Sequence, residues 1–203
     1  RVASYTTNPS MMLTAITSHL DHELIPIGFR RKKATWNRES QGIVEVIDIQ
    51  ISKSGDRVTM NAGVLPRPVY AMCWGYKAKP FVLEPECVVR ARVGRLIDNM
   101  DRWFRVDDPT TADQLAGFLV PHVLPYLVRI RSLEGMRDQL ASEGVLQGKY
   151  PLPAIYFAVL QYSLGDISGA CQVLSGLENR TPSWNTRVRE VAARIGCTSS
   201  PTE

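Results

Sequence analysis

Residues 43–65 read IVEVIDIQISKSGDRVTMNAGVL, and the fold is built around this stretch. Alternate positions form one mainly apolar set, made of Ile43, Glu45, Ile47, Ile49 and Ile51 in the first half and Val58, Met60, Ala62 and Val64 in the second. Successive side chains of a strand point to opposite faces, so each half predicts a strand with one face toward a core. Gly55 and Asp56 are turn residues between the halves. The stretch therefore predicts an antiparallel hairpin.

The opposite face of this hairpin becomes polar toward the turn. It carries Asp48, Gln50, Thr59 and Asn61. A polar row of this kind is typical of a sheet face exposed to water. A recognition surface is the alternative interpretation.

A helix and a strand are predicted before the hairpin. Asn8 and Pro9 form a helix start, with Asn8 as the N-cap, and apolar residues then recur at steps of three and four up to Leu24. The basic run at 30–33 is interpreted as a charged edge of the sheet, and contact with phosphate or an acidic protein is the alternative. Residues 35–37 continue as a strand.

A proline-rich segment follows the hairpin. Residues 66–86 contain four prolines, and we expect these to prevent any regular element. Aromatic residues are interleaved with lysines in this segment, among them Tyr70, Trp74, Tyr76 and Phe81. So many aromatic residues indicate a lid that packs on the domain or a binding surface.

A further strand and a helical region follow. Residues 88–97 alternate as a fourth strand, with Arg90 and Arg92 on one face, where they pair with carboxylates or phosphates of a partner or neutralise Asp48 and Glu84 within the fold. Residues 101–106 predict a short strand.

Residues 112–131 are strongly helical. Pro121 and Pro125 lie within this stretch and predict a kink or two short helices. We expect this region to cover the isoleucine face of the sheet.

From residue 132 onward the pattern is helical throughout. Residues 153–163 and 166–177 resemble a single tetratricopeptide helix pair, with Asp166 as an N-cap, and a last helix covers about 184–195. The predicted fold class is α+β: an antiparallel sheet of about four strands, a leading helix and a helix on one face. We divide the chain into an α+β domain at 1–131 and a helical extension at 132–203, with a disordered tail.

Composition narrows the class of protein. No run approaches the ~20 apolar residues of a membrane helix, so no membrane contact is expected. The net charge of +4 lies within residues 1–108, which weakly favours an acidic partner. The four cysteines form no CxxC pair and give little support to a zinc site. We expect reduced thiols in a cytoplasmic protein, without metal or cofactor.

Several short segments carry a resemblance to a known family. They are LIPIGFRRKKATWNRE, VIDIQISKS, VTMNAGV, VRARVGRL and DRWF. In this order they resemble a bacterial domain family of unknown function, number 4304, over roughly residues 9–131. The matching positions are Gly28, Phe29, Trp36, Arg38, Gln50, Asn61, Gly63, Arg90, Arg92, Gly94 and Trp103. Asp48 stands where the family pattern has Asn, and Phe104 where a second Trp is common.

The resemblance implies a binding protein rather than a catalyst. Proteins that look like this are often encoded near secreted bacterial toxins, so it implies an immunity protein that binds and neutralises a cognate toxin. The residues expected to contact the partner are Trp36, Asp48, Gln50, Asn61, Tyr70, Trp74, Arg90 and Arg92. Aromatic residues and arginine carry most of the binding energy at protein interfaces. For each residue, a structural role inside the fold is the alternative.

Two other function classes stay open. The sequence has no GxSxG, Walker, GxGxxG or HExxH motif, and its three histidines have no evident partners, so we expect no catalytic residues. Binding of nucleic acid or a small ligand is the runner-up, because the basic run at 30–33 and a pI near 9.0 permit it.

Overall fold

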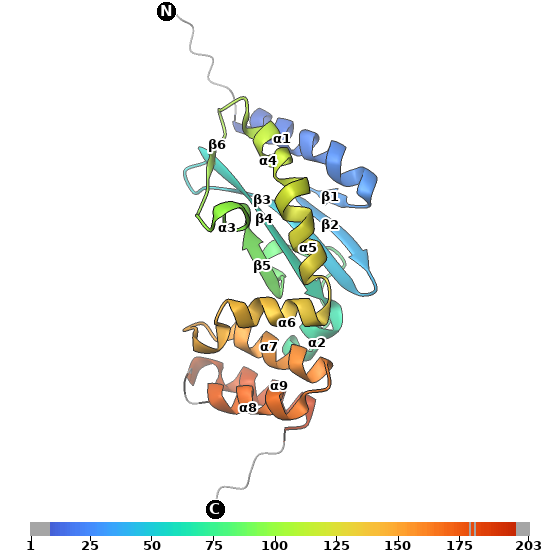
Figure 1. Cartoon of the computed structure of the whole chain (residues 1–203), viewed down its shortest axis with the longest axis vertical. Coiled ribbons are helices and arrows are strands. Elements are labelled where there is room, and N and C mark those ends of the chain that lie inside the picture. The colour runs from blue at the N-terminus through green and yellow to red at the C-terminus, as the bar shows by residue number, and fades with distance from the viewer. Residues whose placement is uncertain (1–8, 179, 181, 198–203) are drawn as a thin grey trace, which may run out of the picture.

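The computed structural model describes residues 9–178, 180 and 182–197 (Figure 1). The predicted N-cap Asn8 and almost all of the predicted disordered tail lie outside these residues. The described strands are β1 (Arg30–Lys32), β2 (Thr35–Ser40), β3 (Ile43–Ile51), β4 (Arg57–Pro66), β5 (Val89–Arg92) and β6 (Phe104–Arg105). They form one antiparallel sheet in the order β1-β2-β3-β4-β5, and β6 pairs with β4. The α+β class is confirmed, with six described strands instead of about four.

The hairpin at the centre of the sheet is the predicted one. Its register pairs Ile47 with Ala62 and Ile49 with Met60, so these four side chains share one face. All four are buried in the main core. The alternation along the chain therefore set the buried face correctly.

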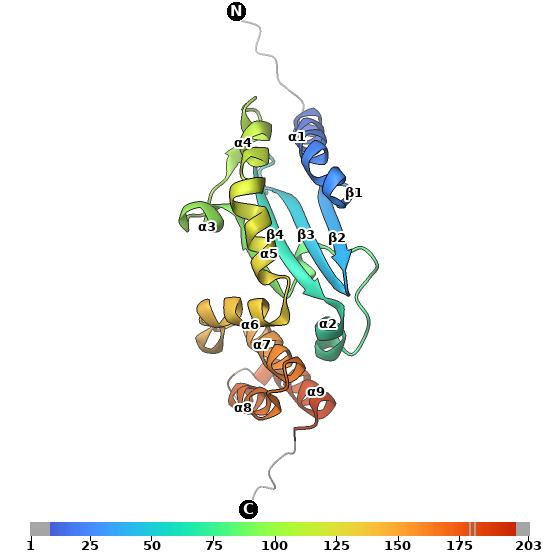
Figure 2. The same cartoon turned by 45° about the vertical axis from the view of Figure 1, so that its right-hand side comes forward.

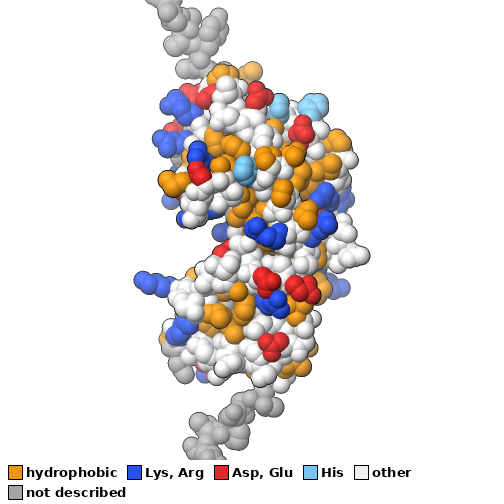
Figure 3. Space-filling model, in the orientation of Figure 1, with side chains coloured by type: hydrophobic (Ala, Val, Ile, Leu, Met, Phe, Trp, Pro, Cys, Tyr) orange, Lys and Arg blue, Asp and Glu red, His pale blue; other side chains and the backbone are white. Residues whose placement is uncertain are grey.

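Helices α1 (Pro9–Leu24), α4 (Thr111–Gly117) and α5 (Leu124–Ile130) cover this face (Figures 1 and 2). Between α4 and α5 the chain forms the π-helical turn η3 (Leu119–Val123), which contains Pro121. This turn is the predicted interruption, since proline cannot donate the regular helical hydrogen bond. Figure 3 shows hydrophobic side chains across the outer surface of this helical layer.

The other face of the sheet has two parts. Near the open end of the hairpin, Val44, Val46 and Leu65 form a second apolar cluster with Tyr70, Val82 and Cys87. Toward the turn this face is polar, as the sequence indicates. The covering residues come from α2 (Arg67–Trp74) and from the segment that leads through η2 (Glu84–Glu86) to β5.

Two element predictions are wrong. Residues 66–86 were expected to hold no regular element, but 67–74 form helix α2, because Pro68 lies in the first turn, where no helical N–H bond is needed. Residues 88–97 were expected to be a single strand, but the strand ends at Arg92 and Val93–Asp98 form helix α3. Arg90 and Arg92 nevertheless share one face, as predicted.

The C-terminal helices stack below the sheet (Figures 1 and 2). They are α6 (Leu133–Ser142), α7 (Leu152–Ser163), α8 (Ile167–Leu177) and α9 (Asn185–Ile195). The short turn η4 (Val145–Gln147) precedes α7 and η5 (Pro182–Trp184) precedes α9, while η1 (Ile25–Ile27) follows α1. Asp166 caps α8 as predicted, with Oδ1 accepting the Gly169 N–H at 2.8 Å. Helix α2 packs against α7 and α9 and so joins the sheet to this stack.

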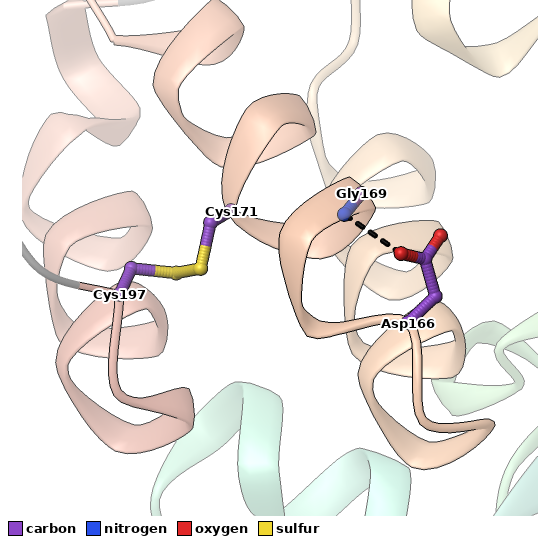
Figure 4. Close-up of a disulfide and its surroundings, with 4 residues drawn as sticks. All are labelled: Asp166, Gly169, Cys171 and Cys197. Carbon is purple, nitrogen blue, oxygen red and sulfur yellow. Dashed lines mark hydrogen bonds between the residues drawn. A yellow bond between two sulfur atoms is a disulfide. The ribbon is translucent and has the colours of Figure 1, made fainter.

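The prediction of reduced thiols is wrong for two of the four cysteines. Cys171 on α8 and Cys197 after α9 form a disulfide, with 5.5 Å between their Cα atoms (Figure 4). Cys73 and Cys87 are free and buried. The paired cysteines lie 26 residues apart in sequence without a recognisable motif, and only the packing of α9 on α8 brings them together.

Candidate binding site on the polar sheet face

Three neighbouring strands bring predicted site residues into one row. Asp48 on β3 lies opposite Asn61 on β4, which lies opposite Arg92 on β5. Gln50 and Arg90 fall on the same face by the two-residue period. These five residues line a groove of about 640 Å³ together with Glu84, Arg95 and Asp101. We call it the polar groove.

Gly63 on β4 allows β5 to lie close to the rest of the sheet. A Cβ atom at this position would meet the Val89 carbonyl oxygen at 2.7 Å and the Arg90 Cβ at 2.9 Å. Atoms do not approach so closely, and a larger residue would push β5 away. The glycine therefore helps to place Arg90 in the groove.

Asp48 and Asn61 form the polar floor of the groove. The Thr35 hydroxyl donates to Asp48 Oδ1 at 2.6 Å, and Asn61 Nδ2 donates to Gln50 Oε1 at 3.0 Å. Asn61 is buried, whereas Gln50 is exposed. The buried Asn61 amide is thus held by the exposed Gln50 amide.

Arg92 is the most highly connected side chain in the groove. Its guanidinium donates to Asp101 Oδ1 and, at 3.3 Å, to Gln50 Oε1. It also lies 4.8 Å from the centre of the Trp103 ring, and the Trp103 Nε1–H donates to Asp101 Oδ2 at 3.3 Å. Stacking on an aromatic ring and pairing with a carboxylate fix the plane of a guanidinium.

Arg90 pairs with Glu84, one of the two internal partners considered for the arginines. Arg90 Nη1 donates to Glu84 Oε2 at 3.0 Å, with the Glu84 side chain almost buried and the Arg90 side chain half exposed. The pairing leaves most of the Arg90 guanidinium facing the groove.

Two carboxyl groups in the groove have raised pKa values. Burial raises the pKa of Asp48 above its usual range, although hydrogen bonds from Thr35 and Asn61 act in the opposite direction. Burial also raises the pKa of Glu84, and Arg90 lowers it while the nearby charge of Asp48 raises it. Desolvation of the charged form is the dominant cause in both cases.

Three predicted contact residues lie away from the groove. Trp36 is fully buried in the main core, where its Nε1–H donates to Asp21 Oδ1 at 2.8 Å. It offers no surface to a partner, and we leave it out of the candidate site. Its position on β2 opposite Ile47 explains this, because that face of the sheet is the one covered by helices.

Tyr70 and Trp74 lie on α2 at the junction with the C-terminal helices. Tyr70 is buried against the second apolar cluster, and the Trp74 Nε1–H donates to the Tyr156 hydroxyl on α7 at 2.8 Å. Arg187 of α9 lies 4.8 Å from the Trp74 ring centre. Both aromatic residues thus connect parts of the fold and do not line the groove.

Sequence reasoning assigned no partner contact to Glu84, Arg95 or Asp101. Glu84 lies in the proline-rich segment, a few residues before β5. This closeness in sequence was only a weak indication that Glu84 reaches the groove. Arg95 and Asp101 face the groove because the chain turns into α3 after Arg92. The strand prediction over 88–97 concealed this turn.

The described residues contain no cluster of three or more His, Cys, Asp or Glu able to hold a metal ion. In the same residues, no helix has the length and apolar character of a membrane span.

Comparison with known proteins gives one match. The model of a family described as a domain of unknown function, DUF4304, matches residues 20–129. The chain belongs to the DUF4304 family. The matched range ends within α5, the last helix that packs on the sheet. It includes every residue of the polar groove. No curated protein and no solved structure matches the chain.

Proposed function

We propose that this DUF4304 protein is a non-catalytic protein-binding module, an immunity protein that neutralises a cognate bacterial toxin by binding it through the polar groove. The observation that carries the proposal is the convergence of five expected contact residues, from three neighbouring strands, on one groove. Arginines held by acidic and aromatic partners resemble the energetically dominant residues of protein interfaces.

Two exposed apolar residues are neighbours in sequence of groove residues. Leu83 precedes Glu84 and Met100 precedes Asp101, and both apolar side chains are exposed. A mixture of apolar contacts and polar groups is typical of protein interfaces, which are about as apolar as the rest of a protein surface. Leu83 and Met100 are therefore available for apolar contact with a partner.

The proposed location is the cytoplasm, where an immunity protein protects the producing cell. The buried thiols of Cys73 and Cys87 suit that location, whereas the Cys171–Cys197 disulfide weighs against it, because disulfides are rare in reducing compartments. Alkylation of thiols in intact cells, followed by mass spectrometry, measures the state of this pair.

The test is co-expression with any secreted toxin that a neighbouring gene encodes. We expect the two proteins to co-purify and the toxic effect to disappear. Arg92→Ala should weaken binding by at least about tenfold, as expected for a central interface arginine. Arg137→Ala, on α6 and away from the groove, is the matched control and should bind normally. A toxin that kills equally with or without this protein would contradict the proposal.

A second candidate function is binding or conversion of a small ligand. It is favoured by Asp48 and Glu84, two carboxyl groups with raised pKa values in one groove with arginines. Asp48→Asn separates the candidates. Loss of turnover in a metabolite screen, with toxin binding absent throughout, would support the small-ligand function.

A further inference from the structure

The arginines of the polar groove carry N–H donors for which the fold supplies few acceptors. Each arginine carries five N–H donors and no acceptor. Arg90 uses one nitrogen on Glu84, and Arg95 uses one nitrogen on the Asn99 carbonyl and side chain. Arg92 is bonded through both terminal nitrogens, but its Nε is buried and has no acceptor among the described residues.

Each carboxyl group of the groove already accepts at least one hydrogen bond within the fold. Glu84 Oε2 accepts from Arg90, and the two Asp101 oxygens accept from Arg92 and Trp103. Asp48 Oδ1 accepts from Thr35. The groove therefore offers a ligand several donors, which are the remaining N–H groups of Arg90 and Arg95.

The placement of charge in the groove also favours a ligand that accepts hydrogen bonds. Three arginines face three carboxyl groups in the groove. Glu84 is buried and Asp48 is half-buried, whereas Arg90, Arg95 and Asp101 are exposed. Burial also disfavours the charged forms of Asp48 and Glu84. A ligand approaching from solvent thus meets the Arg90 and Arg95 guanidinium groups, and the exposed Asp101 carboxylate beside them already accepts from Arg92 and Trp103.

We propose that the polar groove receives an acidic side chain of the partner protein, with its carboxylate bound between Arg90 and Arg95. This inference rests on the proposed function and names the chemistry of the partner. The carboxylate accepts from the free guanidinium nitrogens at the opening, a geometry in which arginine forms paired hydrogen bonds. Glu84 keeps Arg90 in position from below.

A peptide of six glutamates is the probe, titrated by calorimetry into the whole protein at low ionic strength. We expect measurable binding, and a loss of about tenfold or more for Arg90→Gln and again for Arg95→Gln. Arg57→Gln is the matched control, since Arg57 is an exposed arginine on β4 outside the groove lining, and it should bind as the unmodified protein does. Circular dichroism of each variant checks that the fold is retained.

The outcomes distinguish this inference from the proposed function. If the toxin binds, and neither Arg90→Gln nor Arg95→Gln weakens that binding, the acidic contact is refuted while the immunity function stands. If the glutamate peptide binds in the expected manner and no toxin does, the groove chemistry stands and the immunity function fails. No binding of the peptide, or stronger binding of a single-stranded oligonucleotide with the same arginine dependence, would overturn the inference.

Discussion

Glu45 is a carboxylate on the core-facing side of β3. Its Oε2 accepts from Arg38 Nε at 2.6 Å, and its Oε1 is buried without a partner among the described residues. Arg38 also donates to the Ile27 carbonyl and lies 4.5 Å from the Phe29 ring centre. Removing one partner of such an ion pair is destabilising, because the charge of the other partner stays buried and unpaired.

We predict that Arg38→Met lowers the free energy of unfolding by about 2–4 kcal/mol, since it leaves the Glu45 carboxylate buried and unpaired. Urea denaturation followed by circular dichroism measures the change. The double variant Arg38→Met/Glu45→Met should recover most of the loss, and Arg57→Met at an exposed position should show none. A double variant as unstable as the single one would contradict the role of the unpaired charge.

Asp48 makes stability depend on pH. Its pKa in the folded state is raised above the unfolded value near 3.8, so the folded state binds a proton more readily than the unfolded state does. The unfavourable contribution of Asp48 to the free energy of unfolding is therefore absent below the unfolded pKa. It develops as the pH rises through the folded pKa, and is fully present at neutral pH.

Asp48→Asn should accordingly stabilise the protein at neutral pH, and the gain should vanish in acid. Denaturant midpoints measured between acid and neutral pH follow this difference. Asp101→Asn is a control of opposite sign, because Arg92 lowers the pKa of Asp101 and charge loss there removes a favourable interaction. An equal effect of Asp48→Asn at all pH values would rule out linkage to its protonation.

At the scale of elements, α9 holds the end of α2. Arg187 Nη1 donates to the Trp74 carbonyl at 3.2 Å, and Arg194 Nη1 donates to the Met72 and Cys73 carbonyls at 3.1 Å. These carbonyls belong to the last turn of α2, which has no further helical donors and carries partial negative charge. Two arginines of α9, which is far from α2 in sequence, thus cap the C-terminal end of α2.

The double variant Arg187→Ala/Arg194→Ala should lower the free energy of unfolding by about 2 kcal/mol, because the capped carbonyls lose charged donors. Thermal unfolding checks the loss. Arg189→Ala on the same helix should change stability little, because Arg189 pairs with Glu178 at the surface. If Arg189→Ala were as destabilising as the double variant, capping of α2 would not be the cause.

The disulfide joins α8 to the residue after α9. It closes a segment of 26 residues, and restriction of the unfolded chain should contribute about 3 kcal/mol. We predict that Cys171→Ser/Cys197→Ser lowers the free energy of unfolding by this order, and that a reductant then has no further effect on the variant. Denaturation with and without reductant makes the comparison. An unchanged stability would show that the link contributes nothing.

At the scale of the whole molecule, one hydrophobic core runs from the sheet into the helical stack. The same cluster of buried residues includes Ile16 on α1, Leu127 on α5, Leu160 on α7 and Ile195 on α9. Contacts of α2 with α7 and α9, and of α5 with α6, carry it across the junction. Elements that share a core tend to unfold together.

We predict a single unfolding transition for the whole chain. Fluorescence reports on the four tryptophans, which include Trp36 in the sheet core, Trp74 at the junction and Trp184 before α9. Far-ultraviolet circular dichroism reports mostly on the helices. The two signals should change at the same denaturant concentration. Two separate midpoints would instead support independent folding of 1–131 and 132–203.

The sequence by itself determined the central hairpin, its buried face, the helical layer and the capped C-terminal helices. Each of these depends on local periodicity or on a cap within a few residues, and such signals are visible along the chain. Parity along each strand likewise placed Asp48, Gln50 and Asn61 on the polar face of the hairpin, and Arg90 and Arg92 on one face of their own strand. The pairing of β5 with β4 then brought the two groups together.

Only the tertiary structure decided where the aromatic residues lie and what completes the groove. Trp36 is buried because helices cover its face of the sheet, and Glu84, Arg95 and Asp101 reach the groove through turns whose direction depends on packing. The Cys171–Cys197 pair likewise depends on how α9 lies on α8. Contacts between residues far apart in sequence follow from the packing of whole elements, which leaves no local pattern in the chain.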